Sequence, residues 1–443
     1  MIDFKKLSED IKDKREVMKP TPEAPPPKLS DEQQAVLDAA ELKHNILITG
    51  SAGVGKSELY RQLCAKAGGD IASTASTGVA AVNIQGVTIN SWAGLGMGDE
   101  PAEKIVEAVQ KRRAVVDRIR SCNRLAIDEI SMVNGHLFDK LDHVLRTIRK
   151  NPRPFGGIQI IAIGDFLQLP PVSRGGGRAF FAFQSEAWKA AGFKVGMLRK
   201  VWRQSDVAFS AALNDFRTAN LTLAAMEVMR GRYQAPDVDP KFEAIDLHTT
   251  NVDVNALNLE RLAKIDSPAV TYTAEEWGDE WDLKALDKNC LAPRELELKV
   301  GAQVMLLKNL EVESGLANGT IGKVVDLPTK GKKWQHGPTV EFRNGQTRLL
   351  DRATWSVKIG RETVAERIQI PLRLAYAITV HKAQGMSLDK IRVHLGGIFE
   401  DGQAYVALSR ARTLDGLFIQ STKRGCVTAN RDAVRFYEEA ERL

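Results

Sequence analysis

Residues 44–57 read HNILITGSAGVGKS, and this stretch decides the fold of the first half of the chain. Gly50 to Ser57 match the pattern G-x-x-x-x-G-K-[S/T] at every fixed position. The apolar run at 46–48 predicts a buried strand, and ELYRQLCAKA (58–67) predicts a helix, which is the context that the pattern requires. Glycines let backbone N–H groups approach a phosphate, and the helix N-terminus adds positive potential. The stretch therefore predicts a phosphate-binding loop in an α/β domain.

Two side chains of this loop have predicted roles. Lys56 is expected to reach the β- and γ-phosphates of a nucleotide, and the Ser57 hydroxyl is expected to bind Mg²⁺. The alternative is a chance glycine-rich turn, which the flanking strand and helix disfavour. The residues expected to bind ATP in the loop are Gly50, Ser51, Ala52, Gly53, Val54, Gly55, Lys56 and Ser57.

Three further apolar runs, each followed by loop or helix signals, extend the pattern: DIASTAS (70–76), RLAIDEIS (124–131) and IQIIAIGD (158–165). This alternation predicts buried parallel strands joined by crossover helices. Between the first two of these runs, residues 92–120 form a glycine-rich loop followed by a basic helix, which we interpret as a small insertion.

Polar residues follow two of these strands. Asp128 and Glu129 end RLAIDE, where Asp128 suits a metal-holding role and Glu129 suits the base that polarises an attacking water. Gln168 follows the next strand, and its amide is placed to contact a γ-phosphate. The alternatives are two solvated acids at a strand end and an ordinary polar loop residue. The neighbouring phosphate loop favours the catalytic interpretation for the acids.

Two arginines offer cations for the same chemistry. Arg203 lies in VWRQ (201–204) and Arg410 in ALSRAR (407–412). Phosphoryl transfer is helped by a guanidinium that offsets charge developing on the γ-phosphate. On spacing alone, a surface or structural role is the more common one for such residues. If Arg410 comes from a second α/β unit, ATP binding would draw the two units together.

The organisation of the chain predicts two α/β units after an N-terminal arm. Residues 1–28 pair a charged stretch with TPEAPPPK and predict a flexible arm and proline-rich linker. The first unit is expected at 29–217 and the second at 218–443. Within the second, residues 299–369 change to short strands and turns, with hairpin signals at Asn318-Gly319 and Asn344-Gly345. We interpret this segment as an inserted β-barrel.

Composition narrows the class of protein. Of 443 residues, 43% are hydrophobic and 27% charged, which disfavours collagen-like, coiled-coil and disordered chains. Lys+Arg 62 against Asp+Glu 56 gives a net charge of +6, compatible with a polyanionic partner. No apolar run approaches the ~18 residues of a membrane span, and the start has no signal core. The four cysteines lie far apart and predict neither disulfides nor a zinc site, so a cytoplasmic protein is expected.

Taken together, eight ordered blocks make the sequence resemble superfamily-one DNA helicases of the RecD-like branch. The connector at 131–161 resembles the Pif (petite integration frequency) helicase family in particular. The resemblance runs from about Leu29 to Leu417 and leaves out the N-terminal arm. The blocks are LSDEQ (29–33), GSAGVGKS (50–57), TASTGVAAVNIQGVTINSWAG (74–94), DEISMV (128–133), GDFLQLPPV (164–172), VWRQ (201–204), AITVHKAQGMSLD (377–389) and GQAYVALSRARTLDGL (402–417).

The resemblance implies an ATP- and Mg²⁺-dependent DNA helicase that moves 5′→3′ along single-stranded DNA and unwinds duplexes. Its expected partners are single-stranded DNA, single-strand/duplex junctions and G-quadruplex DNA, with no membrane and a monomeric state. Its expected fold is two RecA-like domains, with a wedge insertion at 92–120 and a Src-homology-three-like (SH3-like) β-barrel at 299–369. The family acts in DNA replication, repair and recombination. A eukaryotic source would move the expected compartment to the nucleus or mitochondrion.

The resemblance also assigns residues. Gln33 would recognise the adenine edge, and Gln168, Arg203 and Arg410 would act on the γ-phosphate. Many members of the family have histidine where this chain has Asn90, so a base or phosphate contact there is expected to differ. Trp92 is a stacking candidate or a buried anchor, and His381 a phosphate donor or a structural histidine. The expected DNA-binding residues are Thr77, Asn90, Ser91, Trp92, Thr379, His381 and Lys382.

Two other functions stay open at this point. A phosphotransferase built on a phosphate loop would transfer phosphate to an acceptor rather than to water, and it leaves the later blocks unexplained. A nucleotide-switched DNA-binding subunit would bind single strands without processive unwinding. An ATPase rate that does not respond to single-stranded DNA would favour this second alternative.

Overall fold

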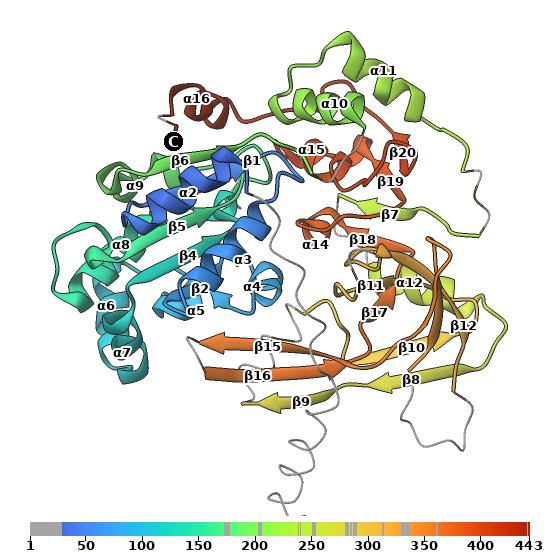
Figure 1. Ribbon diagram of the computed structural model, residues 1–443, viewed down its shortest axis with the longest axis horizontal. Helices are drawn as coiled ribbons and strands as arrows, with labels where there is room; N and C mark the ends of the chain where they lie inside the picture. Colours follow the sequence, from blue (N-terminus) through green and yellow to red (C-terminus); the bar gives the residue numbers. More distant parts are fainter. Residues whose placement is uncertain are drawn as a thin grey trace, which may run out of the picture.

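The computed structural model contains two α/β lobes and a group of antiparallel strands (Figure 1). None of the helices in the described ranges combines the length and apolar character needed to span a membrane. The expected N-terminal arm lies outside the described residues. The structure describes residues 29–171, 178–202, 206–237, 239, 241–249, 254–279, 283, 286, 290–311, 314–328, 337–359, 362–440 and 442–443.

The first lobe is built on a six-stranded parallel sheet with the order β3-β2-β4-β5-β1-β6. Strands β1 and β5 are buried along their whole length because helices cover both faces of the sheet. All four strands expected from the apolar runs are present. The bounds are β1 (Ile46–Gly50), β2 (Ile71–Ala75), β3 (Val87–Thr88), β4 (Arg124–Asp128), β5 (Gln159–Ile163) and β6 (Lys194–Leu198).

Polar side chains begin most helices of this lobe. Ser30, for example, accepts from the Gln33 N–H while the Gln33 side chain accepts from the Ser30 N–H, a reciprocal cap. The insertion expected at 92–120 holds two helices, α6 and α7, which pack on α8. The bounds are α2 (Asp31–Glu41), α3 (Lys56–Lys66), α4 (Gly78–Asn83), α5 (Ile89–Ala93), α6 (Ala102–Gln110), α7 (Arg113–Ser121), η2 (Ile130–Met132), α8 (Gly135–Arg149), η3 (Pro154–Gly157), η4 (Ala182–Gln184) and α9 (Glu186–Ala191).

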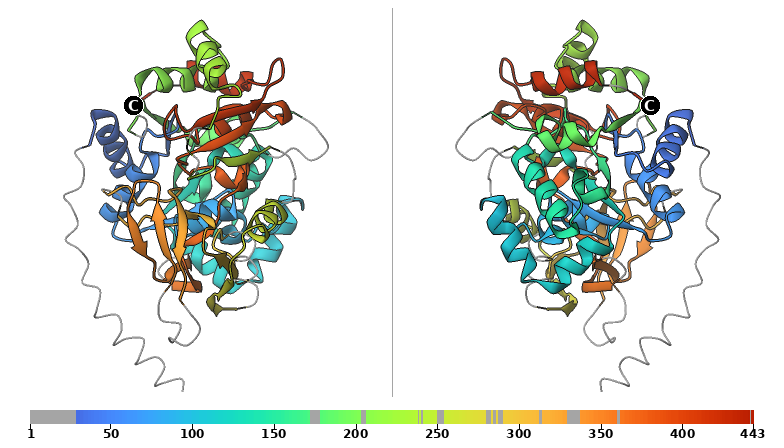
Figure 2. Two further views of the ribbon diagram at one scale, coloured as in Figure 1. Left: turned by 90° about the vertical axis from the view of Figure 1, so that its right-hand side faces the viewer. Right: turned by 90° about the vertical axis from the view of Figure 1, so that its left-hand side faces the viewer.

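The second lobe has a four-stranded parallel sheet, β18-β7-β19-β20. The helices α10 and α11 precede it and lie at the end of the molecule opposite the antiparallel strands (Figures 1 and 2). The bounds are α10 (Val207–Thr218), α11 (Leu223–Arg232), β7 (Ile245–His248), α12 (Val254–Ala263), β18 (Ala377–Thr379), α14 (Val380–Ala383), β19 (Ile391–His394), η6 (Leu395–Gly397), α15 (Gln403–Leu408) and β20 (Leu417–Ser421). An α/β fold with parallel-sheet cores is thus confirmed.

Antiparallel strands form three small sheets, β14-β13-β12-β11-β17, β15-β16-β9 and β10-β8. They start at Ala269, ahead of the segment 299–369 in which short strands were expected. Gly345 has φ 84° in the turn between β13 and β14, as its hairpin signal predicts. The bounds are β8 (Ala269–Thr273), β9 (Glu275–Gly278), β10 (Glu295–Lys299), β11 (Gln303–Leu306), β12 (Ile321–Asp326), β13 (Thr339–Phe342), β14 (Thr347–Leu349), β15 (Ala353–Ile359), β16 (Glu362–Gln369) and β17 (Leu372–Leu374).

The last helix, α16 (Arg431–Glu439), returns to the first lobe, and the C-terminus lies beside β6 (Figure 1). The Tyr437 hydroxyl lies 2.7 Å from the Thr49 hydroxyl and accepts from the Phe166 N–H at 2.9 Å. The Phe436 ring stacks on Phe183 at 4.6 Å. Because Thr49 immediately precedes the phosphate loop, these contacts hold α16 against the first lobe beside that loop.

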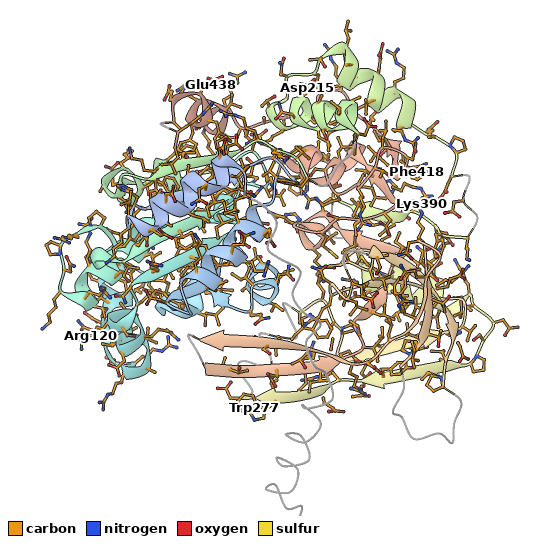
Figure 3. The ribbon with its side chains drawn as sticks, viewed as in Figure 1. Arg120, Asp215, Trp277, Lys390, Phe418 and Glu438 are labelled. Atoms are coloured by element: carbon orange, nitrogen blue, oxygen red, sulfur yellow. The ribbon has the colours of Figure 1, made fainter. Side chains whose placement is uncertain are left out.

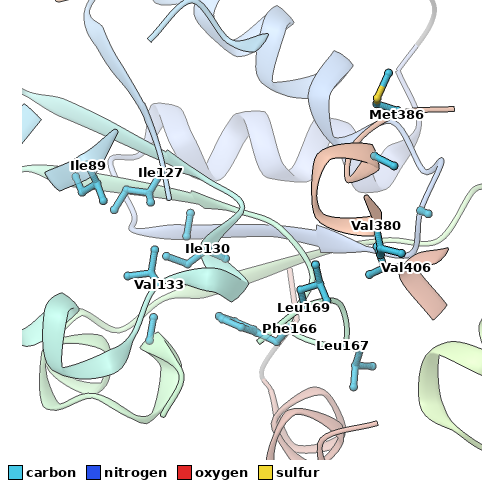
Figure 4. Packing of buried hydrophobic residues seen from close by; sticks show 14 of the residues in the cluster. Ile89, Ile127, Ile130, Val133, Phe166, Leu167, Leu169, Val380, Met386 and Val406 are labelled. Atoms are coloured by element: carbon cyan, nitrogen blue, oxygen red, sulfur yellow. The ribbon is translucent and has the colours of Figure 1, made fainter. Parts of the chain in front are cut away.

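One apolar core runs through both lobes. In Figure 4, Ile127, Ile130 and Phe166 of the first lobe belong to the same buried cluster as Val380 and Val406 of the second. All five side chains are fully buried. Each such side chain contributes roughly 1.5–3 kcal/mol of burial free energy, so the lobes are held together behind the polar site.

Candidate nucleotide and nucleic-acid site

A cleft of about 760 Å³ lies between the two lobes. The first lobe lines it with the phosphate loop, with the carboxyl end of β4 and with α4. The second lobe adds α14, the segment that follows it and Arg410, and the antiparallel strands add Lys308 and Trp355. Ligands of open α/β sheets bind at the carboxyl ends of the strands, which is where this cleft opens.

Backbone geometry builds the phosphate loop. Gly50 has φ 138°, and a Cβ placed on it would lie 2.2 Å from the Leu198 carbonyl oxygen, so no larger residue fits. Gly55 has φ 87° and is the N-cap residue immediately before α3. The Lys56 ammonium donates to the carbonyl oxygens of Gly50 at 2.7 Å and Ser51 at 2.9 Å. This holds its charge inside the loop, where a phosphate would be bound.

The acidic pair lies across from this lysine. Asp128 ends β4, and its carboxylate accepts from the Glu129 N–H at 2.9 Å. Burial and the charge of Glu129 raise the pKa of Asp128 to about 7. Burial also raises the pKa of Glu129, against the opposing influence of Lys56 and Arg410. Two carboxylates crowded in this way are stabilised by a cation, which makes the pair suited to a divalent metal.

No group of three His, Cys, Asp or Glu side chains able to hold a metal occurs among the described residues. A Mg²⁺ ion at this place would therefore take only Ser57 and Asp128 from the protein, and its other ligands would be phosphate oxygens and waters. Both side chains line the same cleft. The donor set fits Mg²⁺, which keeps several waters and favours hard oxygen ligands.

Two side chains of the second lobe reach this acidic pair. The Gln384 amide donates to the Glu129 carboxylate at 2.9 Å, although the two residues are 255 positions apart. Arg410 is only 2% exposed and lines the cleft with Lys56 and Glu129. Its guanidinium donates to the Val406 carbonyl at 2.8 Å and the Ser409 hydroxyl at 2.8 Å. Burial lowers the pKa of Arg410, and the nearby charge of Glu129 opposes that effect.

The remaining expected nucleotide residues lie around the loop. Gln33 is buried, and its side-chain amide nitrogen faces Gly55. Gln168 is 6% exposed and lines the cleft. Arg203 lies outside the described residues, but its neighbour Trp202 donates its backbone N–H to the Gly53 carbonyl at 2.9 Å.

The expected DNA-binding residues divide into three groups. Thr77, His381 and Lys382 line the cleft. The second group is not among the residues that line the cleft. Asn90 and Ser91 lie on α5, and Thr379 caps α14 by accepting from the Lys382 N–H at 3.3 Å. Trp92 is 1% exposed, so its ring has no free face for a base in this conformation.

Sequence reasoning did not single out several residues that join the lobes. The Tyr405 hydroxyl accepts from the Ala52 N–H of the phosphate loop at 2.7 Å. Gly402 lies against the Gln168 carbonyl oxygen, 2.4 Å from where a Cβ would stand. Together with Gln384, these residues lie in the blocks 377–389 and 402–417, so the signal was present but assigned to other members of the blocks. A further contact, Arg217 with Asp165, had no sequence signal.

Comparison with known proteins identifies the family. The model of PIF1-like helicases matches residues 28–237, and that of the DNA helicase Pif1 2B domain matches residues 283–327. The chain is 36% identical to a solved Pif1 helicase from Candida albicans, with a TM-score of 0.71 over 93% of this chain and 99% of that one. The chain belongs to the PIF1-like helicase family.

Two other relatives are similar over most of this PIF1-like chain. "ATP-dependent DNA helicase PIF1" of Danio rerio is 41% identical over 93% of the chain. The chain spans 64% of that relative's length. A Bacteroides Pif1 helicase in complex with ADP-AlF3 and single-stranded DNA is 31% identical, with a TM-score of 0.60 over 93% of this chain and 96% of that one.

Proposed function

We propose that this PIF1-like chain is an ATP-dependent DNA helicase that moves along single-stranded DNA and unwinds duplexes. The observation that carries the proposal is the meeting of both lobes at one phosphate loop. Gln384 and Arg410 of the second lobe reach Glu129 and the cleft that Lys56 lines. A nucleotide bound there touches both lobes, so its cleavage changes how they hold each other. The relatives named for ATP, ADP-AlF3 and single-stranded DNA support the ligands.

The chemistry follows from the residues of the cleft. Lys56 and the loop N–H groups hold the β- and γ-phosphates, and Ser57 and Asp128 hold Mg²⁺, which offsets phosphate charge when bound. Glu129 accepts a proton from the attacking water, for which a raised pKa suits it. Arg410 must leave its carbonyl partners to reach the γ-phosphate, and Gln168 lies where it senses that group. We propose Arg203 as a second cation and Gln33 as the adenine-recognising residue.

The single strand is proposed to follow the wall of the cleft formed by Thr77, His381 and Lys382. Asn90, Ser91 and Thr379 extend this path, whereas we propose that buried Trp92 anchors α5 rather than stacking on a base. The 5′→3′ polarity, G-quadruplex opening and action as a monomer are proposals taken from the family resemblance. So is its action in the cytoplasm of a bacterium or the nucleus or mitochondrion of a eukaryote.

We also propose a division of labour along the chain. Residues 29–217 and 218–443 are proposed as the two RecA-like motor units, with α6 and α7 as the wedge at the duplex junction, although α10 at the boundary packs on α11 and α15 of the second lobe. The antiparallel strands, which include the expected SH3-like segment 299–369, hold the strand against the motor. Lys308 and Trp355 of this part line the cleft, which supports its contact with nucleic acid.

The test is strand displacement on duplexes with only a 5′ or only a 3′ single-stranded overhang. We expect displacement of the 5′-overhang substrate with ATP and Mg²⁺, and none without ATP. Lys56→Ala should abolish ATP turnover and displacement while single-strand affinity stays measurable, because the two ligands use different residues. Binding without displacement on either substrate would favour the nucleotide-switched binder. Displacement from the 3′ overhang alone would overturn the polarity.

A further inference from the structure

Arg373 occupies an unusual position at the centre of β17. Its backbone pairs with Met305 of β11, and the residue is 9% exposed. Its side chain makes no hydrogen bond or ion pair within the part of the chain that the structure describes. None of its guanidinium nitrogens is among the fully buried polar atoms that lack a partner, so they reach solvent although most of the residue is buried. Their N–H donors can therefore meet an acceptor from outside the protein.

The other buried cations of the described residues show how unusual this is. Arg217 is paired with Asp165, Arg367 with Glu276, and Lys390, which Figure 3 labels, with Asp237. Arg410 lacks a carboxylate but donates to two carbonyls and a hydroxyl. Arg373 is the one of these five buried cations whose side chain has no hydrogen-bond acceptor or carboxylate partner in the described part of the protein. Burial accordingly lowers its pKa to about 10.

A second cation stands beside it. Burial of Lys382, on α14, lowers the pKa of its ammonium group, and the nearby positive charge of Arg373 lowers it further. Lys382 is exposed and lines the cleft. Lys308, across the antiparallel strands, lines the same cleft, and its ammonium lies 5.0 Å from the centre of the Trp355 ring. Arg373 and Lys382 have no carboxylate within the described chain to neutralise them, and both would be stabilised by an anion.

We propose that Arg373 and Lys382 form a site for a backbone phosphate of the single DNA strand. This rests on the proposed function and adds a residue, Arg373, that lies outside the recognised blocks. The guanidinium matches a phosphate with two parallel hydrogen bonds, and Lys382 supplies a second charge at the cleft surface. The nucleotide already has Lys56 and Arg410 for its phosphates. A strand passing His381 and Lys382 carries one phosphate per nucleotide and so needs further cations.

The test compares Arg373→Gln and Arg373→Lys in the full chain with wild type. Affinity for a fluorescent oligothymidine is measured over a series of salt concentrations. We expect Arg373→Gln to bind about tenfold more weakly near ~0.1 M salt, with the slope of log affinity against log salt reduced by about 0.7. Arg373→Lys should keep the slope. Arg348→Gln is the matched control: Arg348 lies on the same five-stranded sheet, its side chain is 42% exposed and pairs with Glu311, and the variant should behave as wild type.

Two further measurements distinguish a DNA contact from a structural role and from a nucleotide contact. The melting temperature of DNA-free Arg373→Gln should not fall below that of wild type, because an unpaired buried charge is removed. A lower melting temperature with an unchanged salt slope marks a structural arginine and overturns the proposal. Weaker binding of fluorescent ADP with unchanged DNA affinity would assign the phosphate to the nucleotide and also overturn it. Failure of the wild type to bind any oligothymidine would instead overturn the proposed function.

Discussion

Glu129 combines three features at a single residue. Its backbone has φ 52° and ψ 48°, a left-handed conformation that non-glycine residues rarely adopt. Its carbonyl oxygen accepts from the Ser76 hydroxyl at 2.8 Å, and its carboxylate accepts from Gln384. Strain of this kind costs about 1–3 kcal/mol and is held in place by the surrounding structure. The conformation turns the carboxylate away from the end of β4 and into the cleft.

Replacing Glu129 with glutamine tests its role as the base. Glutamine keeps the size and the contact with Gln384 but cannot accept the proton of the attacking water. We expect Glu129→Gln to bind ATP with near-normal affinity and to hydrolyse it about 10²–10⁴-fold more slowly. Single-turnover hydrolysis and nucleotide titration measure the two effects separately. Near-normal turnover would remove Glu129 as the base.

The buried pair of Asp165 and Arg217 predicts a pH dependence of stability. Burial alone would raise the pKa of Asp165, but the charge of Arg217 and two hydrogen bonds of 2.8 Å more than offset this and hold the pKa below its usual value. A lowered carboxyl pKa contributes stability at neutral pH that is lost as the pH falls below about 4. Asp165→Asn should therefore cost about 3–5 kcal/mol at pH 7, because Arg217 is left buried and unpaired.

Denaturant unfolding at pH 7 and at low pH measures both effects. The penalty of Asp165→Asn should shrink as the wild-type carboxyl becomes protonated. Glu186→Gln, which removes one partner of an exposed pair, is the control and should change stability by less than about 1 kcal/mol. Equal penalties for the Asp165 variant at both pH values would contradict the assigned ion pair.

At the scale of elements, the start of α15 is a place where the backbones of the two lobes approach closely. Gly402 has φ 73°, and a Cβ there would lie 2.4 Å from the Gln168 carbonyl oxygen and 2.6 Å from that of Leu167. The first turn of α15 carries Tyr405, whose hydroxyl accepts from the phosphate loop. The helix thus connects the phosphate loop and Gln168, the proposed γ-phosphate sensor, to the block that holds Arg410.

Gly402→Ala should push α15 away from Gln168. The added methyl meets two backbone oxygens that cannot move aside, and alanine is strained at this positive φ. We expect a loss of about 1–3 kcal/mol in stability together with weaker stimulation of ATP turnover by single-stranded DNA. Gly425→Ala, also at positive φ but with no atom within 4 Å of its Cβ, is the matched control for strain alone. Equal effects of the two variants would show that the lobe contact is unimportant.

The sequence predicts local elements better than distant contacts. The four strands around the phosphate loop were predictable because buried parallel strands are short apolar runs, and Asn344-Gly345 because the turn needs positive φ. The contact of Tyr437 with Thr49 spans 388 positions, and nothing in the sequence of α16 distinguishes its partner lobe. The insertion was expected to hold one helix and holds two, since the break falls at Lys111 and Arg112, which are ordinary helix residues.

In the candidate site, too, the residues of local motifs were predictable from the sequence, whereas burial and pairing were not. The loop, Asp128 and Glu129 were predictable from motif chemistry, and Arg410 from the family resemblance; all of them line one cleft. Trp92 had two interpretations that only burial separates. Arg373 could not be predicted from the sequence. An unpaired arginine is identified only when the structure shows that its guanidinium has no hydrogen-bond or ion-pair partner in the protein.

For the whole molecule, the central claim is that nucleotide and strand share one cleft whose walls belong to different lobes. Lys56, Glu129 and Thr77 come from the first lobe, and Lys382 and Arg410 from the second. A ligand that touches both walls shifts the balance between their arrangements, and the coupling between two such ligands is reciprocal. The apolar core behind the cleft contains side chains of both lobes and joins them.

The most direct test is a linkage measurement on the full chain. Oligothymidine affinity is titrated with and without ADP-aluminium fluoride and Mg²⁺, and nucleotide affinity is titrated with and without oligothymidine. We expect each ligand to change the affinity for the other by the same factor, about 5–150-fold, and Arg410→Ala to bring this factor close to one. Oligothymidine affinity that is identical in all nucleotide states of the wild type would contradict this expectation.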